Sequence, residues 1–534
     1  MMRIQDNEQK IKQTLFWLLT ISVIIRSIAA ASIEFGNDEV YYWTYALYPD
    51  QSHFDHPPMV GWIIQLFSLN LLFDSEFFIR LASILFMTAN TYIIYCIGKE
   101  IKSTQAGLYA ALLYTASIYA FVITGIFILP DTPLSFFSFL AFWMAVLYFK
   151  RLHSQQHSDS FIILFGVFAG LAMLSKYSGI FLWIGMMLYI LLFDRKPLKT
   201  CAFYCALLIS LNAVIPILKW NIEYDFISFN FHGDRVSLFT KPNLGYFGTE
   251  LAGEFLYNNP INFVLAVIAV ITAFKGKINM EKSALRLVLC IALPLVLTFL
   301  FFSLTRQTLP HWNAPAYNLI ILLSACWLCD KNKTQNERFV IPQCIAAALS
   351  ILVLTVGIGI AEINTGFIPL DRHTEPEKLG RNDFTLDMYG WRQLETKFAT
   401  LREQKITEGV MKEKDGIVAD EWFPLANLDY YVARPLGMKV MGIGYIEKLH
   451  KYLWINEKRG GFKKGEDFWF LTDSRYLKNP NTLYPGGFES IEFVDTITIE
   501  RGGKPAKNFF VYTCKGLIYM QPTVSETIAK IKTE

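Results

Sequence analysis

Apolar residues are arranged along the first two thirds of the chain in runs long enough to cross a lipid bilayer. A membrane-spanning helix needs about 20 residues, because each residue advances the helix by about 1.5 Å. The pattern predicts eleven such helices, near residues 14–33, 77–98, 105–126, 132–149, 160–175, 178–193, 200–218, 260–274, 284–304, 315–329 and 339–361. The first of them is followed by further spans, so we interpret it as an anchor.

A further apolar run at residues 58–73 is too short for a twelfth span. As a helix it would reach only about 24 Å, and Gln65, Ser68 and Asn70 interrupt it. We therefore interpret this run as a helix that lies along the outer membrane interface and begins at Pro57-Pro58.

Charged residues are concentrated in the last third of the chain. Residues 362–534 hold 25 basic and 25 acidic side chains, against 24 and 21 in residues 1–361. Strand-like runs such as 468–471 and 491–499 are separated there by Gly/Pro/Asn turns, and a helical pattern covers 391–404. We expect a polytopic all-α membrane domain at residues 1–361, with interfacial helices in its first outer loop, and a soluble α/β domain at residues 362–534.

Lysine and arginine are distributed unequally between the two sets of connecting segments. The segments on the side of the amino terminus hold 16 of these residues, and the opposite segments hold five. Cytoplasmic loops retain positive residues, so the amino terminus is predicted to be cytoplasmic. With eleven spans, the carboxyl-terminal domain then lies on the outer, periplasmic or equivalent, face.

The composition excludes several classes of protein. Hydrophobic residues make up 53% and charged residues 18% of the chain, whereas soluble domains carry about 25% charge. The net charge of +3 is small and dispersed, so we expect no nucleic-acid partner. Cys514 is the one cysteine in the polar tail, so the tail domain is expected to fold without an internal disulfide.

Acidic residues in the predicted outer loops are candidates for catalysis. Asp38 and Glu39 directly follow the first span, where a carboxylate can accept a proton from a hydroxyl or bind a sugar. The adjacent Tyr41 and Tyr42 can stack on a sugar face, although a solvated loop end beside an interfacial aromatic belt is the alternative. Asp131 lies at the mouth of the fourth span, where helix capping explains it equally well.

Basic residues on the same predicted side are suited to binding a phosphate group. Guanidinium and ammonium groups pair strongly with phosphate oxygens, although isolated cations near span ends also extend to lipid headgroups. Asp55 and His56 precede two prolines that stiffen the chain. A divalent metal is left open as an alternative, but no His/Asp spacing supports it, so we assign no metal ligand and no cofactor. The candidates for binding phosphate or substrate are Tyr41, Tyr42, Asp55, His56, Arg80, Lys176, Arg235 and His311.

Several motifs, taken in chain order, resemble a known family. They are GNDEVYYW at 36–43, FDHPPM at 54–59, FFIRLAS at 77–83, LPDTPL at 129–134, LSKY at 174–177, PHWNAP at 310–315 and YGWR at 389–392. As an ordered set they are similar to those of bacterial membrane glycosyltransferases of the GT-C class. Within this class they resemble the protein mannosyltransferase-like enzymes that include the lipid A aminoarabinose transferases.

The resemblance implies a sugar donor carried on polyprenyl phosphate and an acceptor oxygen at the periplasmic face of the bacterial inner membrane. It places Asp38 at the catalytic centre, with Glu39 beside it and Asp131 as the second loop acid. His56 stands where the aminoarabinose transferases have a lysine before the prolines, which indicates a different sugar or acceptor. The expected acceptor is lipid A, lipopolysaccharide or another envelope glycan, with protein Ser/Thr as the alternative.

Two other classes of protein also have many spans. A transporter or flippase for lipid-linked sugars tends to have Gly/Pro-broken spans in corresponding halves, and the two halves of this sequence show no correspondence. A structural scaffold would not require the acidic and basic residues of the outer loops. Release of polyprenyl phosphate from a labelled donor distinguishes transfer from both.

Overall fold

The computed structural model describes residues 2–235, 241–332 and 340–533, which fall into two compact units. The first, here the helical unit, comprises Met1–Ala31, His56–Asn221 and Phe229–Val356. The second, here the mixed unit, comprises Ser32–Asp55, Ile222–Ser228 and Gly357–Glu534. The segment that follows the first long helix therefore groups with the carboxyl-terminal part of the chain.

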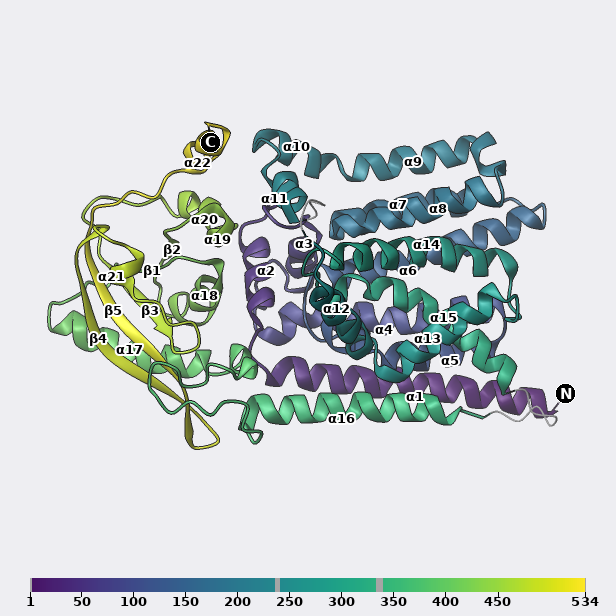
Figure 1. Ribbon diagram of the computed structural model, residues 1–534, viewed down its shortest axis with the longest axis horizontal. Coiled ribbons are helices and arrows are strands. Elements are labelled where there is room, and N and C mark those ends of the chain that lie inside the picture. The colour runs from purple at the N-terminus through teal and green to yellow at the C-terminus, as the bar shows by residue number, and fades with distance from the viewer. Residues whose placement is uncertain (1, 236–240, 333–339, 534) are drawn as a thin grey trace. The chain divides into compact units, whose positions relative to one another are not determined.

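The helical unit is built from helices joined by short connections (Figure 1). Its helices are α1 (Met2–Ser32), α3 (Met59–Phe67), α4 (Glu76–Ile101), α5 (Thr104–Ala116), α6 (Asp131–His153), α7 (Asp159–Ser175), α8 (Phe181–Leu192), α9 (Cys201–Ala213), α10 (Ile215–Glu223), α11 (Ile227–Arg235), α12 (Leu244–Tyr257), α13 (Pro260–Phe274), α14 (Lys282–Ser303), α15 (Ala314–Lys331) and most of α16 (Gln343–Thr365). A π-helical turn covers Tyr119–Ile123, and 3-10 turns cover Tyr177–Ile180, Lys196–Lys199 and Pro310–Trp312.

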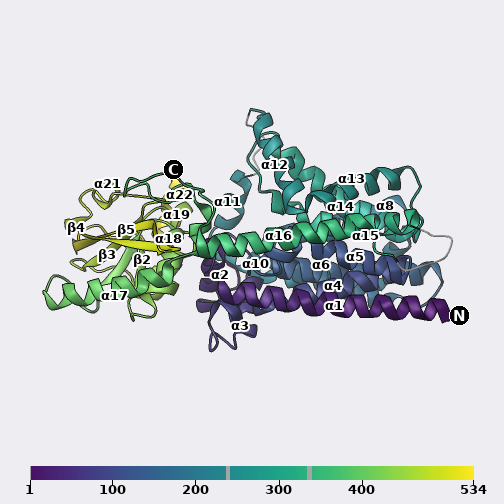
Figure 2. The same cartoon turned by 90° about the horizontal axis from the view of Figure 1, so that it is seen from below.

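Close helix packing gives this unit its core. Helix α7 packs between α6 and α9 (Figure 1), and α15 packs against α5, α13 and α14 (Figure 2). A Cβ atom at Gly166 of α7 would lie 2.4 Å from the carbonyl oxygen of Ala206 in α9. Only glycine allows the two backbones to approach so closely, as small residues commonly do between membrane helices.

Several helices are apolar and long enough to cross a membrane. Among the described residues there are six, or seven if α12 and α13, which bend by 105° at their junction, count as one span. The six are Asn7–Ser32, Glu76–Ile101, Asp131–His153, Cys201–Glu223, Lys282–Ser303 and Gln343–Thr365. The structure is thus that of a membrane protein with several apolar helices, and the count of eleven stays a prediction.

The run at residues 58–73 forms a short helix and an irregular turn. Helix α3 has nine residues, so it extends only about 14 Å. The side chains of Leu66, Leu69 and Leu72 are 67, 61 and 73% exposed. The predicted interfacial position of this segment stays a prediction, and the exposed leucines are compatible with it.

The mixed unit contains a five-stranded sheet flanked by helices (Figure 1). The strand order is β2-β1-β3-β5-β4; β2, β1 and β3 are parallel, and β5 pairs antiparallel with both β3 and β4. The strands are β1 (Gly416–Ala419), β2 (Val440–Gly442), β3 (Phe468–Asp473), β4 (Phe488–Arg501) and β5 (Lys504–Leu517). The helices are α2 (Asn37–Leu47), α17 (Trp391–Thr407), α18 (Trp422–Asn427), α19 (Ile446–Leu449), α20 (Tyr452–Lys458), α21 (Pro480–Leu483) and α22 (Val524–Thr533). A 3-10 turn covers Phe384–Met388, and a π-helical turn covers Leu428–Ala433.

The predicted strands and helix of the tail are present. Run 468–471 lies in β3, run 491–499 lies in β4, and the helical pattern at 391–404 lies in α17. All residues of β1 and β3 are buried, as expected for parallel strands that are covered on both faces.

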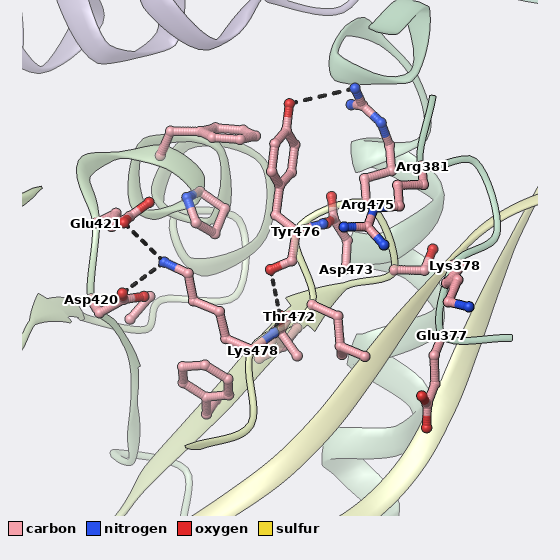
Figure 3. A pocket seen from close by; sticks show the side chains of 17 residues that line it. Glu377, Lys378, Arg381, Asp420, Glu421, Thr472, Asp473, Arg475, Tyr476 and Lys478 are labelled. Atoms are coloured by element: carbon pink, nitrogen blue, oxygen red, sulfur yellow. Dashed lines mark hydrogen bonds and ion pairs between the residues drawn. The ribbon is translucent and has the colours of Figure 1, made fainter. Parts of the chain in front are cut away.

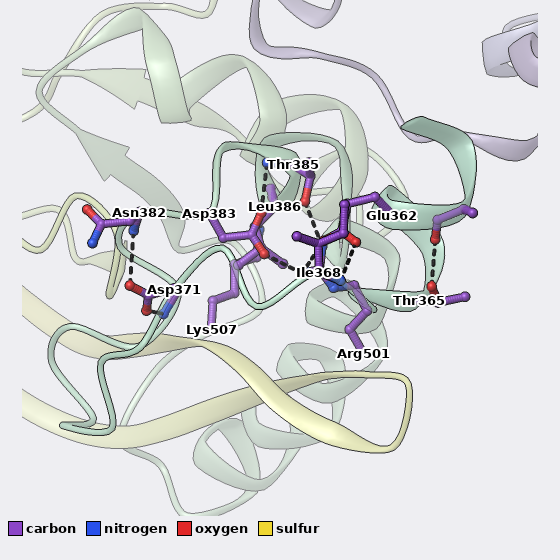
Figure 4. A network of polar contacts seen from close by, with 12 residues as sticks. Glu362, Thr365, Ile368, Asp371, Asn382, Asp383, Thr385, Leu386, Arg501 and Lys507 are labelled. Atoms are coloured by element: carbon purple, nitrogen blue, oxygen red, sulfur yellow. Dashed lines mark hydrogen bonds and ion pairs between the residues drawn. The ribbon is translucent and has the colours of Figure 1, made fainter. Parts of the chain in front are cut away.

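A polar network fixes the segment that leads from α16 into the sheet (Figure 4). Arg501, at the end of β4, pairs with Asp383 and donates to the hydroxyl of Thr385 at 2.8 Å. Its guanidinium also lies 3.8 Å from Glu362 near the end of α16. The three acceptors come from residues 362–385. One buried arginine therefore holds this irregular segment against the hairpin of β4 and β5.

The start of helix α17 is held by an acid that lies far away in the sequence. The carboxylate of Glu34 accepts hydrogen bonds from the backbone nitrogens of Trp391 at 2.8 Å and Arg392 at 3.1 Å. Gly390 precedes the helix with φ +91°, and a Cβ atom there would lie 2.4 Å from Ile499. The YGWR motif is therefore explained by a helix start that requires glycine and is capped by a distant acid.

Candidate active site

Asp131 and Lys176 form a buried ion pair in the helical unit. Nζ of Lys176 lies 2.8 Å from Oδ2 and 3.0 Å from Oδ1 of Asp131, and the hydroxyl of Tyr119 donates to Oδ1 at 2.9 Å. The side chains of Asp131 and Lys176 are 4 and 11% exposed. The ammonium group has three N–H donors, and within the described residues Asp131 is its one acceptor. One donor thus remains for a ligand.

Two helix ends place this pair. Asp131 is the first residue of α6, and Lys176 follows the last residue of α7 in extended conformation, with φ −158° and ψ 143°. Helices α6 and α7 pack against each other, and the two helix dipoles favour an anion at the first position and a cation at the second. The N-cap of α6 is Pro130, with no side-chain cap, so the carboxylate of Asp131 binds Lys176 and Tyr119 instead of capping its own helix.

His311 belongs to the same group of side chains. It lies in the turn Pro310–Trp312, and both Lys176 and Asp131 act electrostatically on its ring. Burial, and after it the charge of Lys176, lower the pKa of His311 to about 4, while Asp131 opposes the shift. The ring is therefore neutral at pH 7 and can donate or accept a hydrogen bond. Motifs 129–134, 174–177 and 310–315 thus meet in one place.

His56 lies beside the same loop. Its ring centroid is 6.2 Å from that of His232 in α11, and the His232 ring is 5.1 Å from that of Tyr177, the neighbour of Lys176. The side chain of Arg235, the last residue of α11, lies outside the described part of the chain. Within the described residues, no group of three or more His, Cys, Asp or Glu side chains is placed to hold a metal ion.

Arg80 has a contact of a different kind. Its side chain is fully buried, and Nη1 donates to the backbone oxygen of Ala30 at 3.0 Å, near the carboxyl end of α1. The guanidinium also lies 5.6 Å from the ring of Phe127. A cation at the carboxyl end of a helix is stabilised by the helix dipole. The observed contacts of Arg80 are structural, and its role in binding phosphate stays a prediction.

The neighbouring acids Asp38 and Glu39 have different surroundings in the mixed unit. Glu39 is 2% exposed, and its Oε2 accepts a hydrogen bond from the backbone nitrogen of Gly36 at 3.0 Å. This contact closes the first turn of α2, as in a capping box. Asp38, on the same turn, is exposed. Of the two acids, Asp38 is therefore the one whose side chain is exposed, and its catalytic role stays a prediction.

Asp55 anchors a cluster of tyrosines in the mixed unit. Its Oδ1 accepts hydrogen bonds from the hydroxyls of Tyr41 at 2.8 Å and Tyr45 at 2.5 Å. Burial, and then the charge of Asp55, raise the pKa of Tyr41 and Tyr45, so both hydroxyls keep their protons and donate. Tyr42 packs against both rings and is 5% exposed. The predicted stacking of Tyr41 and Tyr42 on a sugar stays a prediction.

The sequence analysis did not predict two groups of buried polar residues. Tyr119 carries no charge and lies inside an apolar run, so nothing in the sequence marks it. Glu250 and Glu254 are both buried on α12, and the side-chain amide of Asn313 donates to both carboxylates. The hydroxyl of Tyr317 donates to Glu254 at 2.7 Å. Two acids one helical turn apart in an apolar stretch are a signal that would have found this pair.

Comparison with known proteins identifies relatives in sequence and in fold. The family model of dolichyl-phosphate-mannose-protein mannosyltransferases matches residues 55–220. The lipid A galacturonosyltransferase RgtD of Rhizobium johnstonii is 23% identical over 422 residues, which are 76% of this chain and 81% of that protein. ArnT from Cupriavidus metallidurans bound to undecaprenyl phosphate has a TM-score of 0.59 and 14% identity, with 94% of this chain and 98% of that chain covered. Its apo state has a TM-score of 0.58, 13% identity and the same coverage.

These matches confirm the resemblance that the ordered motifs indicate. The chain has the fold of ArnT over nearly its whole length. The family match includes His56, Arg80, Asp131 and Lys176 within its range. The comparisons thus show a fold like that of ArnT and, at residues 55–220, a match to the mannosyltransferase family model.

Proposed function

We propose that the protein transfers a sugar from a polyprenyl-phosphate donor to lipid A or another envelope glycolipid at the periplasmic face of the bacterial inner membrane. The observation that carries the proposal is the buried pair Asp131–Lys176, which leaves one N–H of Lys176 available beside the neutral ring of His311. The similarity to a lipid A galacturonosyltransferase and to ArnT bound to undecaprenyl phosphate supports the class of donor and acceptor.

In the proposed reaction, the acceptor oxygen forms a bond to the anomeric carbon, and the bond from that carbon to the phosphate oxygen breaks. Negative charge develops on the departing phosphate, and Lys176 and His311 can each donate a hydrogen bond to it. His56, Arg80 and Arg235 are further candidates for this role. Polyprenyl phosphate is the second product.

The acceptor determines whether a base is needed. A hydroxyl acceptor must lose its proton as it attacks, and we assign this proton to the exposed carboxylate of Asp38. An acceptor that is already an ionised phosphate needs no base. With either acceptor, the buried Glu39 and Asp55 support the local structure around Asp38, since their carboxylates accept hydrogen bonds from the chain itself.

The proposal includes the finer topology. Eleven spans within residues 1–361, a cytoplasmic amino terminus and a periplasmic domain at residues 362–534 would bring Asp38, Asp131 and His311 to the outer side of the membrane. Alkaline phosphatase, which is active only outside the cytoplasm, tests this topology when fused after residue 534. An active fusion supports a periplasmic tail, and an inactive but expressed fusion contradicts it.

The experiment that tests the activity uses the purified full chain in detergent. Undecaprenyl-phosphate galacturonic acid labelled in the sugar is the first donor, because the curated relative is a galacturonosyltransferase, and lipid A is the acceptor. Label appearing in lipid A with equal release of undecaprenyl phosphate supports the proposal. Tight binding of the donor without release favours a transporter, and label in protein favours O-glycosylation of Ser/Thr. The comparisons favour neither alternative.

A further inference from the structure

The mixed unit contains a cavity that the transfer reaction does not use. It has a volume of about 560 Å³, which is within the usual range for small-molecule sites. Its walls are the ends of β1 and β3, the loops that follow them, and a turn at residues 377–381 (Figure 3). All of its lining residues belong to the carboxyl-terminal part of the chain, and none lies among the acids or cations considered above.

The sheet topology places this cavity where open α/β sheets bind ligands. Strands β1 and β3 are parallel neighbours, so their carboxyl ends lie at the same edge. After β1 the chain continues to β2 on one side, and after β3 it continues to β4 and β5 on the other side. The two loops therefore diverge, and the crevice between diverging loops at carboxyl strand ends is the usual binding position in such sheets.

The charged side chains of the cavity are balanced in number. Its lining includes four basic and four acidic side chains. On one side Lys478 holds the carboxylates of Asp420 at 2.7 Å and Glu421 at 3.1 Å. On the other side lie Lys378, Arg381 and Arg475 together with Glu377 and Asp473, and Tyr476 lies between the two sides (Figure 3). A ligand that fits both sides carries hydroxyl donors at one end and an anionic group at the other.

The basic side has free donors. Arg381 is exposed, and within the described residues its guanidinium makes no hydrogen bond or ion pair. Arg475 is 8% exposed and pairs with Asp387, yet its Nε has no partner in the described part of the chain. A planar guanidinium suits bidentate binding of a phosphate or carboxylate group.

The aromatic side chains add an apolar surface. The rings of Phe423 and Tyr476 meet edge to face, with centroids 5.2 Å apart and an interplanar angle of 89°. Phe423 is partly buried and Tyr476 is 46% exposed. A partly open aromatic pair of this kind can contact the apolar face of a sugar ring, while carboxylates accept hydrogen bonds from its hydroxyls.

We infer that this cavity binds a saccharide that carries one anionic group, a phosphate or a carboxylate. Arg381 and Arg475 bind the anion, Asp420 and Glu421 accept hydrogen bonds from the hydroxyls, and Phe423 contacts the ring. A dinucleotide is disfavoured, because the loop after β1 continues as Asp420-Glu421-Trp422-Phe423-Pro424 and lacks the glycines that let a pyrophosphate approach a helix start. The site is independent of the transfer activity.

Isothermal titration calorimetry of the full chain in detergent tests this site. Glucosamine 6-phosphate is the probe, with glucosamine and inorganic phosphate as its two halves. We expect the sugar phosphate to bind about tenfold more tightly than either half, because both sides of the cavity contribute. Equal binding of inorganic phosphate and the sugar phosphate would reduce the cavity to a general anion site and overturn the inference.

Substitutions locate the binding. Arg381→Ala should weaken the sugar phosphate about tenfold, roughly the loss of one charge-assisted contact. Arg372→Ala is the matched control, since Arg372 is exposed on the same segment but does not line the cavity, and it should bind like the wild type. Because Arg381 is exposed, its substitution should leave the melting temperature unchanged. Equal affinities of the two variants would contradict the inference.

The source of the saccharide is a separate arm of the experiment. Lipid A in micelles is added to the wild type with glucosamine 6-phosphate bound. Displacement of the sugar phosphate identifies a glycolipid headgroup as a ligand of the site. If the sugar phosphate stays bound, the ligand is a free sugar. Failure of binding here leaves the labelled-donor assay unaffected, so the two proposals fail separately.

Discussion

Nζ of Lys176 lies 2.8 Å from Oδ2 of Asp131, and both side chains are almost completely buried. Each member of such a pair is tolerated at low dielectric because the other is present. The pair joins the start of one apolar helix to the end of another, so it contributes to the fold and to the proposed site together. The two contributions can be separated by substitution.

Lys176→Met should destabilise the protein and abolish transfer. The substitution leaves the carboxylate of Asp131 buried without its cation, which typically costs about 3–5 kcal/mol. The double variant Lys176→Met/Asp131→Asn removes both charges and should recover most of the stability but none of the transfer. Thermal unfolding in detergent and the labelled-donor assay measure the two effects. A double variant that recovers turnover would contradict a role for Lys176 in binding the phosphate.

Asp38 and Glu39 should respond in opposite ways to the loss of charge. Asp38→Asn removes the proposed base, so we expect transfer to a hydroxyl acceptor to fall about 10²–10⁴-fold, with an unchanged melting temperature because Asp38 is exposed. Glu39→Gln weakens the helix start that Glu39 closes and should cost about 1 kcal/mol of stability, with transfer close to that of the wild type. Wild-type turnover of Asp38→Asn would remove its assigned role.

The pH dependence of transfer should contain no contribution from His311 near pH 6.5. Burial lowers the pKa of His311 to about 4, so the ring stays neutral between pH 5.5 and 8. Between about pH 4 and 6.5, the unfolded chain binds this proton and the folded chain does not, so His311 lowers stability as the pH falls through that window. His311→Gln should leave the shape of the kcat/KM profile between pH 5.5 and 8 unchanged. A limb near pH 6.5 that the substitution abolishes would contradict this assignment.

Lys507 should make the mixed unit more stable as the pH rises above 8. The side chain is completely buried, and burial lowers its pKa from 10.5 to about 8, while Asp473 opposes the shift. Between pH 8 and 10 the unfolded chain keeps a proton that the folded chain has lost, so the free energy of unfolding increases by up to about 2 kcal/mol.

Lys507→Met provides the comparison, because other groups also titrate in this range. The difference in melting temperature between wild type and variant, measured from pH 7 to 10, should change in favour of the wild type as the pH rises. A difference that is constant over this range would show that Lys507 keeps an ordinary pKa in the folded protein.

The sequence alone predicted the features that depend on composition and local pattern. Apolar runs indicated membrane helices such as Glu76–Ile101, because a bilayer requires long apolar segments. Turn residues and strand-like runs indicated β3, β4 and α17. The ordered motifs indicated the GT-C resemblance, since their spacing and order are properties of the sequence itself.

Only the tertiary structure decided which polar groups are partners. It joined Asp131 to Lys176 and Tyr119, and it assigned Glu34 to a helix start more than 350 residues away. It also separated Glu39, which closes its own helix, from the exposed Asp38. These contacts depend on how helix ends and strand ends meet in space. Local pattern carries no information about such distant neighbours, because burial and packing of the whole chain select them.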